Sequence, residues 1–95
     1  MVGTNKSMTE CFGSTCHGAG RVMSRSKAKK EIDSDKLRKD LFNQKGIVVL
    51  AQSKSGLSEE APQAYKDVSQ VVEIAHNAGL SKKVAKLEPL GVIKG

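Results

Sequence analysis

Apolar residues recur at helical spacing in three parts of the chain. Residues 21–31 contain good helix formers and neither Gly nor Pro, although their few apolar positions make only a narrow stripe. Residues 35–45 follow cap-type side chains and precede Gly46, and both features are typical helix boundaries. The third pattern spans residues 59–79 and tolerates Pro62 in its first turn. The spacing therefore predicts three helices.

Two other stretches favour β-strands. Residues 47–50 form a continuous apolar run of mostly β-branched side chains, which is typical of a strand buried on both faces. Residues 84–93 contain Pro89, which restricts a strand there to the edge of a sheet. Residues 52–56 are polar, and we expect them to form a loop. Two strands are too few for an independent sheet, so we expect an α/β (α+β) fold that is part of a larger mixed sheet.

Length and composition limit the class of protein. The 95 residues suffice for one small domain or a piece of a larger one, and a hydrophobic content of 38% supports a globular core. No apolar run is long enough to span a membrane, and no N-terminal stretch has the pattern of a signal peptide. These observations exclude an integral membrane protein and predict a cytoplasmic one. Two cysteines can close at most one short loop, so the chain is not a disulfide scaffold.

Positive charge outweighs negative charge. Sixteen Lys and Arg residues against ten Asp and Glu residues give a formal net charge of +6. Residues 21–30 hold a block of basic side chains with no acidic residue among them. Such a block is commonly a solvated face, but it is also typical of a surface that contacts nucleic acid.

The segment that begins at His17 carries the clearest candidate chemistry. Gly18 and Gly20 allow the backbone to turn tightly and to approach a ligand closely. If a helix starts near Arg21, its free N–H groups point back toward this segment, and Arg21 and Arg25 project from one helix face. An imidazole beside such groups favours a phosphate-ester site with His17 as the nucleophile. The alternative is an ordinary turn next to a histidine without chemistry.

Metal binding and cysteine chemistry are weaker alternatives. Cys11, Cys16 and His17 lie close in sequence, but their spacing departs from that of zinc sites. His76 falls in the third helical pattern without a companion ligand. A Cys16–His17 catalytic pair is disfavoured because neighbours in sequence rarely direct their side chains at each other. We therefore predict no metal site within this chain.

One nine-residue run resembles a known family signature. Residues 17–25 read His-Gly-Ala-Gly-Arg-Val-Met-Ser-Arg, and this run is similar to the signature of the RtcB family of RNA ligases. The resemblance extends to residues 2–4 and 60–66, and residues 89–95 look like the family's own C-terminus. It implies that residues 1–95 are the C-terminal portion of a single RNA-ligase catalytic domain whose upstream part is absent here.

The resemblance implies a definite reaction. The family joins an RNA 3′-phosphate or 2′,3′-cyclic phosphate end to a 5′-hydroxyl end in tRNA splicing or RNA repair, with GTP and manganese. Its histidine takes GMP from GTP, and the guanylate then passes to the RNA. The implied partners are RNA, GTP and the missing N-terminal part of the same enzyme, without a membrane.

The implied site residues follow the matching positions of this sequence. His17 is the expected nucleophile, and the guanylate is expected to lie against Gly18, Ala19 and Gly20. By resemblance alone, Tyr65 borders the nucleotide pocket and Lys94 contacts the guanine; Arg21 and Arg25 hold phosphates of nucleotide or RNA. The family's manganese ligands lie upstream, so this chain alone is expected to be inactive.

A second function belongs to a different class. A basic module that contacts RNA without catalysis of its own would also account for the net charge and for the basic block in residues 21–30. The near absence of aromatic side chains opposes this alternative, because single-stranded RNA is commonly bound by stacking its bases on aromatic rings.

Overall fold

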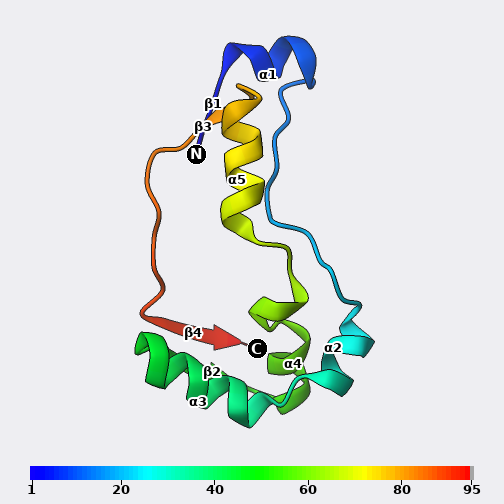
Figure 1. The fold of residues 1–95 in the computed structure, drawn as a ribbon, viewed down its shortest axis with the longest axis vertical. Coiled ribbons are helices and arrows are strands. Elements are labelled where there is room, and N and C mark those ends of the chain that lie inside the picture. The colour runs from blue at the N-terminus through cyan, green and yellow to red at the C-terminus, as the bar shows by residue number, and fades with distance from the viewer. Residues whose placement is uncertain (95) are drawn as a thin grey trace. The chain divides into compact units, whose positions relative to one another are not determined.

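The computed structural model describes residues 1–94 and contains helices together with a few short strands (Figure 1). The mixed α/β character predicted from the sequence is confirmed. In chain order the elements are β1 (Val2–Gly3), α1 (Asn5–Glu10), α2 (Arg25–Glu31), α3 (Ser34–Lys45), β2 (Val48–Ala51), α4 (Lys54–Glu59), the 3-10 helix η1 (Pro62–Ala64), α5 (Val68–Asn77), β3 (Ser81–Lys82) and β4 (Gly91–Lys94).

The chain divides into two compact units. Unit 1 comprises Met1–Gly20 and Lys66–Leu87, and unit 2 comprises Arg21–Tyr65 and the chain from Glu88 onward. Each unit holds its own two-stranded sheet. The sheet of unit 1 pairs β1 with β3, and that of unit 2 pairs β2 with β4.

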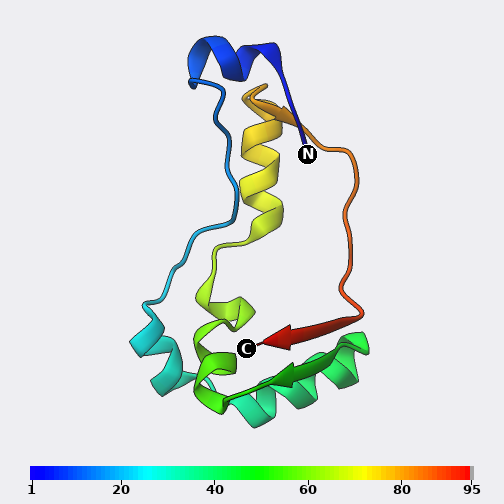
Figure 2. The ribbon, with the colours of Figure 1, turned by 180° about the vertical axis from the view of Figure 1, so that it is seen from behind.

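Unit 1 is built around helices α1 and α5 (Figure 2). Strands β1 and β3 pair antiparallel, with Val2 opposite Lys82. Thr4 caps α1, and its hydroxyl donates to the backbone carbonyl of Gly79, which ends α5 in the left-handed region at φ +75°. This contact ties the start of α1 to the end of α5. The sequence patterns had predicted neither α1 nor the short β1–β3 pair.

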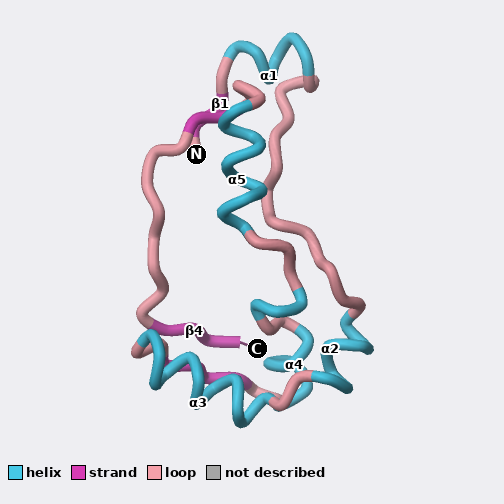
Figure 3. Tube along the Cα trace, in the orientation of Figure 1, coloured by secondary structure: helices cyan, strands magenta, loops and turns pink. Residues whose placement is uncertain are grey.

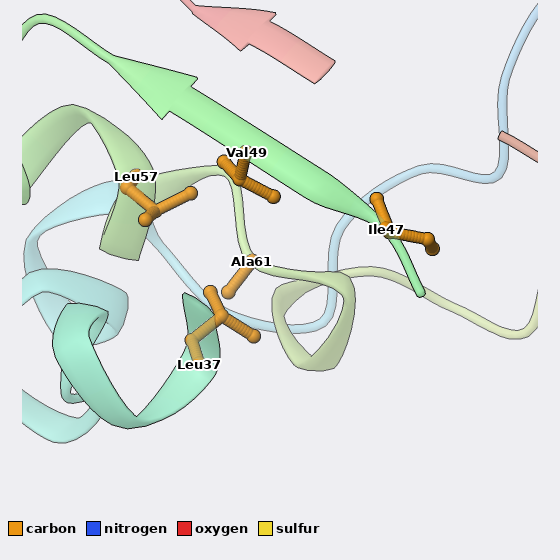
Figure 4. Packing of buried hydrophobic residues seen from close by; sticks show 5 residues of the cluster. All are labelled: Leu37, Ile47, Val49, Leu57 and Ala61. Atoms are coloured by element: carbon orange, nitrogen blue, oxygen red, sulfur yellow. The ribbon is translucent and has the colours of Figure 1, made fainter. Parts of the chain in front are cut away.

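Unit 2 places helices α3 and α4 against strand β2, and Figure 3 shows α3 running alongside that strand. Strands β2 and β4 pair in parallel, from Val48 opposite Gly91 to Ala51 opposite Lys94. Their side chains and those of the two helices form one apolar cluster. Figure 4 shows its buried members, which are Leu37, Ile47, Val49, Leu57 and Ala61.

Helix α3 confirms the second predicted helix to within one residue. The Asp33 side chain accepts hydrogen bonds from the backbone N–H groups of Asp35 and Lys36 at 2.8 and 3.1 Å. Gly46 ends the helix in the left-handed conformation at φ +65°. Both ends of α3 are therefore fixed by the residues that directly flank it.

The strand predicted at residues 47–50 forms as β2, but the expectation that it is buried on both faces is wrong for the part of the chain that the structure describes. Val49 is 4% exposed, whereas Val48 and Leu50 on the opposite face are 51% and 59% exposed. Helices α3 and α4 cover only the Val49 side. The apolar run therefore marks a strand with one open face.

The single helix predicted for residues 59–79 is wrong, because the chain forms α4, η1 and α5 instead. The loop expected at residues 52–56 is also wrong. Ser53 caps α4, with its hydroxyl 3.0 Å from the backbone N–H of Gly56, so the helix begins at Lys54. After η1, the Asp67 side chain caps α5 through the N–H of Ser69 at 2.8 Å.

The strand predicted at residues 84–93 is confined to β4. Residues 83–90 are loop in Figure 3, and Pro89 precedes the strand rather than interrupting it. Because a proline has no N–H to donate to a sheet, pairing begins only after it.

Candidate functional site

His17 and the glycines that follow it lie in a loop of unit 1. His17, Gly18 and Gly20 are exposed, and Ala19 is half-buried. Gly20 adopts φ +74°, a left-handed conformation that a side chain disfavours, and its carbonyl accepts a hydrogen bond from the N–H of Lys66 at 3.0 Å. A Cβ added at Gly18 or Gly20 would meet no atom within 4 Å. The backbone beside His17 is therefore open to a ligand within this unit.

The expected helix start at Arg21 is wrong. Helix α2 begins at Arg25, and Ser24 caps it by accepting the N–H of Lys27 at 3.1 Å. Arg21 instead forms an isolated antiparallel bridge with Tyr65, in unit 2. Because Arg21 precedes the helix, Arg21 and Arg25 do not share a helix face, and the free N–H groups of α2 do not follow directly on Gly20.

The bridge explains why the chain is extended before α2. The N–H groups of Val22 and Met23 both donate to the carbonyl of Ala64, at 2.9 and 3.2 Å. These bonds occupy backbone donors that an earlier helix start would have left free at its first turn. A contact with a segment more than forty residues away in sequence therefore delays the helix by four residues.

The Arg21 guanidinium has several partners. Its Nε donates to the carbonyl of Met23 at 3.0 Å, its Nη1 donates to the Tyr65 hydroxyl at 2.9 Å, and its Nη2 donates to the carbonyl of Glu59. The guanidinium carbon also lies 4.7 Å from the centroid of the Tyr65 ring, within the range of a cation–π contact. Arg21 is 23% exposed and Arg25 is 66% exposed, so the two arginines stand in different environments.

The predicted site residues of unit 2 all contact the Glu60 carboxylate, which is 18% exposed. The Tyr65 hydroxyl donates to Oε2, and Lys94 Nζ lies 3.8 Å from the same oxygen. Oε1 lies 3.6 Å from Arg21 Nη1 and 3.5 Å from Arg25 Nη2. We call this group the Glu60 cluster; its members are Arg21, Arg25, Glu60, Tyr65 and Lys94.

The electrostatics of the cluster follow from these contacts. The hydrogen bond from Tyr65, with smaller contributions from Lys94 and the two arginines, holds the pKa of Glu60 below its ordinary value. The same hydrogen bond raises the pKa of Tyr65. Glu60 is thus ionised and Tyr65 protonated near neutral pH. Three cations around one carboxylate leave an excess of positive charge, which suits a phosphate group.

The basic block of residues 21–30 is partly neutralised by acidic side chains. Lys29 Nζ lies 2.7 Å from Glu59 Oε2, and this hydrogen bond lowers the pKa of Glu59. Lys27 lies 3.8 Å from Glu31, one helical turn away. The block is therefore not simply a solvated face, because several of its members contact α4 or the residue that follows it.

No metal centre forms among residues 1–94, where no three His, Cys, Asp or Glu side chains come together to hold an ion. Cys11 and Cys16 are free cysteines. The Nδ1 of His76 accepts a hydrogen bond from the N–H of Lys83 at 3.1 Å. Within the same described range, no helix combines the length and apolar character needed to cross a membrane.

The predicted site residues therefore fall into two groups. His17 and the three residues after it belong to unit 1, while the Glu60 cluster belongs to unit 2. The structure brings the four predicted residues of unit 2 to one carboxylate.

Comparison with known proteins decides the family. All 95 residues match the protein family described as tRNA-splicing ligase RtcB. The chain belongs to the RtcB family. Among its curated RtcB relatives, the tRNA-splicing ligase of Archaeoglobus fulgidus is 54% identical over 95 residues, and that of Methanococcus maripaludis is 50% identical. The corresponding ligase of Pyrococcus horikoshii is also 50% identical.

Each of these RtcB comparisons covers the whole of this chain but only part of the relative. The chain spans 20% of the Archaeoglobus fulgidus and Methanococcus maripaludis proteins and 11% of the Pyrococcus horikoshii protein. The family resemblance inferred from residues 17–25 is thus confirmed, and the chain corresponds to a small share of an RtcB ligase.

The sequence patterns predict no role for Glu60, although its carboxylate contacts the other members of the Glu60 cluster. In the sequence, Glu60 stands out only as the first residue of the run 60–66 that resembles the family. A usable signal was the acidic pair Glu59–Glu60, since it is the natural counterpart of a basic block that has no acidic residue of its own.

Proposed function

We propose that this chain supplies the nucleophile and part of the nucleotide-binding surface of a GTP-dependent RNA ligase. The ligase would join an RNA 3′-phosphate or 2′,3′-cyclic phosphate end to a 5′-hydroxyl end, in tRNA splicing or RNA repair in the cytoplasm. The observation that carries this proposal is the exposed His17 at the head of a glycine segment with open backbone, in a chain of the RtcB family.

The proposed chemistry at His17 is a nucleotidyl transfer. A ring nitrogen of neutral His17 attacks the α-phosphorus of GTP, the bond from that phosphorus to the bridging oxygen breaks, and pyrophosphate leaves. A 2′,3′-cyclic phosphate end first adds water, which breaks its bond to the 2′-oxygen and leaves a 3′-phosphate. An oxygen of the RNA 3′-phosphate then attacks the phosphorus of the bound GMP, and the bond between that phosphorus and the His17 nitrogen breaks. The 5′-hydroxyl finally attacks the activated 3′-phosphate, and GMP departs as the new phosphodiester forms.

The neighbouring residues have proposed roles in binding. The guanylate lies against Gly18, Ala19 and Gly20. The backbone at the two glycines is uncovered, because the space beside it holds no other atom within 4 Å of a Cβ placed there. In unit 2, Tyr65 borders the nucleotide and Lys94 contacts the guanine, while Arg21 and Arg25 hold phosphates. The positive excess of the Glu60 cluster supports the phosphate role, because an anion gains most where cations outnumber carboxylates.

The residues present do not fit a manganese site, since residues 1–94 bring no three potential ligands together. We propose that the metal ligands, and the remaining nucleotide and RNA contacts, come from the part of the ligase that this chain does not span. The chain alone would then lack activity.

A basic RNA-contacting module without catalysis remains the second candidate. The net charge of +6 and the exposed Arg25 favour it. It predicts RNA binding that weakens steeply with salt and no covalent adduct.

The test uses a chimaera in which this chain replaces the matching 95 residues of the Archaeoglobus fulgidus ligase, its 54% identical relative. The chimaera is incubated with GTP and manganese, and the intact protein and its peptides are weighed by mass spectrometry. We expect one added GMP on the peptide that contains His17.

Two histidine variants make a matched pair, because the chain has only two histidines. We expect His17→Ala to abolish both the GMP adduct and ligation. We expect His76→Ala, whose side chain accepts a backbone N–H in unit 1, to retain both. A GMP adduct that persists in His17→Ala would contradict the assignment, and RNA binding without any adduct would favour the non-catalytic module.

A further inference from the structure

The Glu60 carboxylate lies among the predicted site residues of unit 2, and the proposed function gives it no role of its own. Among residues 1–94, its carboxylate contacts four side chains that the proposed function assigns to nucleotide or phosphate: two arginines, Tyr65 and Lys94. The two oxygens of the Glu60 carboxylate have different partners. Oε1 faces the arginines, and Oε2 faces Tyr65 and Lys94.

We propose that Glu60 is a positioning residue that holds the Lys94 ammonium in place and thereby sets the preference of the ligase for guanine over adenine. This inference rests on the proposed function, because it takes Lys94 as the guanine contact. It adds a residue, Glu60, that never touches the nucleotide.

The Glu60 carboxylate is itself held in place. It accepts the Tyr65 hydroxyl, and the Tyr65 ring and hydroxyl are both contacted by the Arg21 guanidinium. Arg21 is fixed in turn by the carbonyls of Met23 and Glu59. A chain of contacts therefore runs from the backbone of unit 2 through Arg21 and Tyr65 to the carboxylate that Lys94 faces.

Lys94 needs such a partner because only its backbone is fixed by the sheet. Its carbonyl accepts the N–H of Gln52 at 3.0 Å, and it pairs with Ala51 at the end of β4. Its four-carbon side chain is flexible and loses rotamer freedom when its ammonium is held in one place. The Glu60 oxygen at 3.8 Å from Nζ restricts that freedom.

The chemistry of the two bases gives the preference. Guanine presents the O6 acceptor where adenine presents an amino donor. An ammonium group can only donate, so an ammonium held at the O6 position donates to guanine but faces the amino donor of adenine, where no hydrogen bond forms. An unrestrained ammonium can turn away from adenine, and the discrimination then falls.

A simpler role for Glu60 would be to neutralise part of the positive charge. The two roles predict opposite signs for GTP affinity. Removing a neutralising carboxylate strengthens the attraction of the cations for phosphate, whereas removing a positioning carboxylate weakens GTP binding and lowers the GTP-to-ATP affinity ratio.

The experiment measures equilibrium binding of GTP and of ATP to the chimaera, without RNA. The test variant is Glu60→Gln, which keeps the shape of the side chain and can still accept the Tyr65 hydroxyl. The control is Glu59→Gln, since Glu59 is 19% exposed against 18% for Glu60 and contacts Lys29 in place of the cluster. That control also keeps the Glu59 carbonyl that Arg21 uses.

We expect Glu60→Gln to weaken GTP binding and to lower the GTP-to-ATP affinity ratio about tenfold, while Glu59→Gln leaves the ratio within about twofold. Glu60→Asp retains the charge, and we expect it to restore part of the ratio. Tighter GTP binding in Glu60→Gln, or an unchanged ratio, would overturn the positioning role.

The binding readout separates this inference from the proposed function. If the chimaera prefers GTP and loses the preference in Glu60→Gln, but His17 never accepts GMP, the role of Glu60 stands and the nucleophile assignment is wrong. If His17 accepts GMP in every variant and the affinity ratio never changes, the nucleophile assignment stands and the role of Glu60 is wrong. Amide exchange at residues 21–23 that matches the wild-type chimaera would show that Glu60→Gln leaves unit 2 folded.

Discussion

The guanidinium carbon of Arg21 lies 4.7 Å from the centroid of the Tyr65 ring, and Arg21 Nη1 donates to the Tyr65 hydroxyl at 2.9 Å. The same two residues are joined by a backbone bridge. Arg21 therefore holds two segments of unit 2 together, whatever it contributes to a ligand. Arg25 Nη2 lies 3.5 Å from Glu60 Oε1 and its side chain is 66% exposed, so we expect Arg25 to contribute less to the structure than Arg21.

This difference predicts unequal effects of the two arginines on local stability. In Arg21→Ala, the chain loses a cation–π contact and hydrogen bonds to two carbonyls and a hydroxyl, so we expect amide exchange of Val22 and Met23 to accelerate about tenfold. We expect Arg25→Ala to change that exchange less than about twofold, because an exposed ion pair adds little stability. Hydrogen exchange of the chimaera followed by mass spectrometry measures both.

The functional readout of the same variants differs. Both should slow ligation if both arginines hold phosphates, and Arg21→Lys should not restore the rate, because an ammonium cannot reproduce the several bonds of a guanidinium fork. Wild-type ligation rates in both alanine variants would mean that neither arginine holds a phosphate. Arg21 would then have only a structural role, and Arg25 would be a solvated side chain.

The Glu60–Tyr65 hydrogen bond predicts a pH dependence with two limits. The pKa of Glu60 is lowered in the fold, so its contribution to stability is present above the ordinary Glu value of about 4.3 and is lost as pH falls through the lowered value. The pKa of Tyr65 is raised, so its contribution is present below the ordinary Tyr value of about 10 and is lost as pH rises through the raised value.

The alkaline limit can be measured directly. Subtracting the absorbance titration of Tyr65→Phe from that of the unmodified chimaera isolates the Tyr65 phenolate, because every other chromophore contributes to both titrations. We expect Tyr65 to ionise above the ordinary tyrosine range, and to ionise at lower pH in Glu60→Gln. An identical titration in Glu60→Gln would mean that the Glu60 charge does not control the ionisation of Tyr65, and Glu59→Gln serves as the control.

Lys94 should affect nucleotide binding through its side chain. We expect Lys94→Met, which keeps the strand and most of the side-chain length, to weaken GTP binding about tenfold without changing the unfolding midpoint of the chimaera. Removing the last two residues should weaken binding as well. It also removes the bond between the Lys94 carbonyl and the N–H of Gln52, so it can lower stability. Unchanged GTP affinity in Lys94→Met would contradict the guanine contact.

The chain by itself should be a marginal fold and a poor enzyme. The open face of the β2–β4 sheet exposes Val48, Leu50 and Ile93, and a sheet of two strands rarely stands alone in water. We expect the isolated chain to unfold with weak cooperativity, to aggregate and to show no self-guanylylation. A sharp thermal transition together with GMP labelling in manganese would contradict this expectation.

The sequence determined those elements whose boundaries depend on nearby residues. Helix α3 forms where Asp33 and Gly46 place its ends, and strand β2 forms from the β-branched run that starts at Ile47. The family could likewise be recognised from residues 17–25, because the nine residues of its signature are contiguous in the sequence. In each case the information lies within a few residues of the element itself.

Only the tertiary structure decided where helical patterns stop and which charges meet. Ser24 and Ser53 were available as cap residues, but apolar spacing alone favoured other boundaries. The bridge between Arg21 and Tyr65 delayed α2, and separate caps divided residues 54–77 into three elements. The meeting of Arg25, Tyr65 and Lys94 at Glu60 depends on strand pairing and packing between distant segments. Such contacts are long-range, and neither local propensity nor hydrophobic periodicity encodes them.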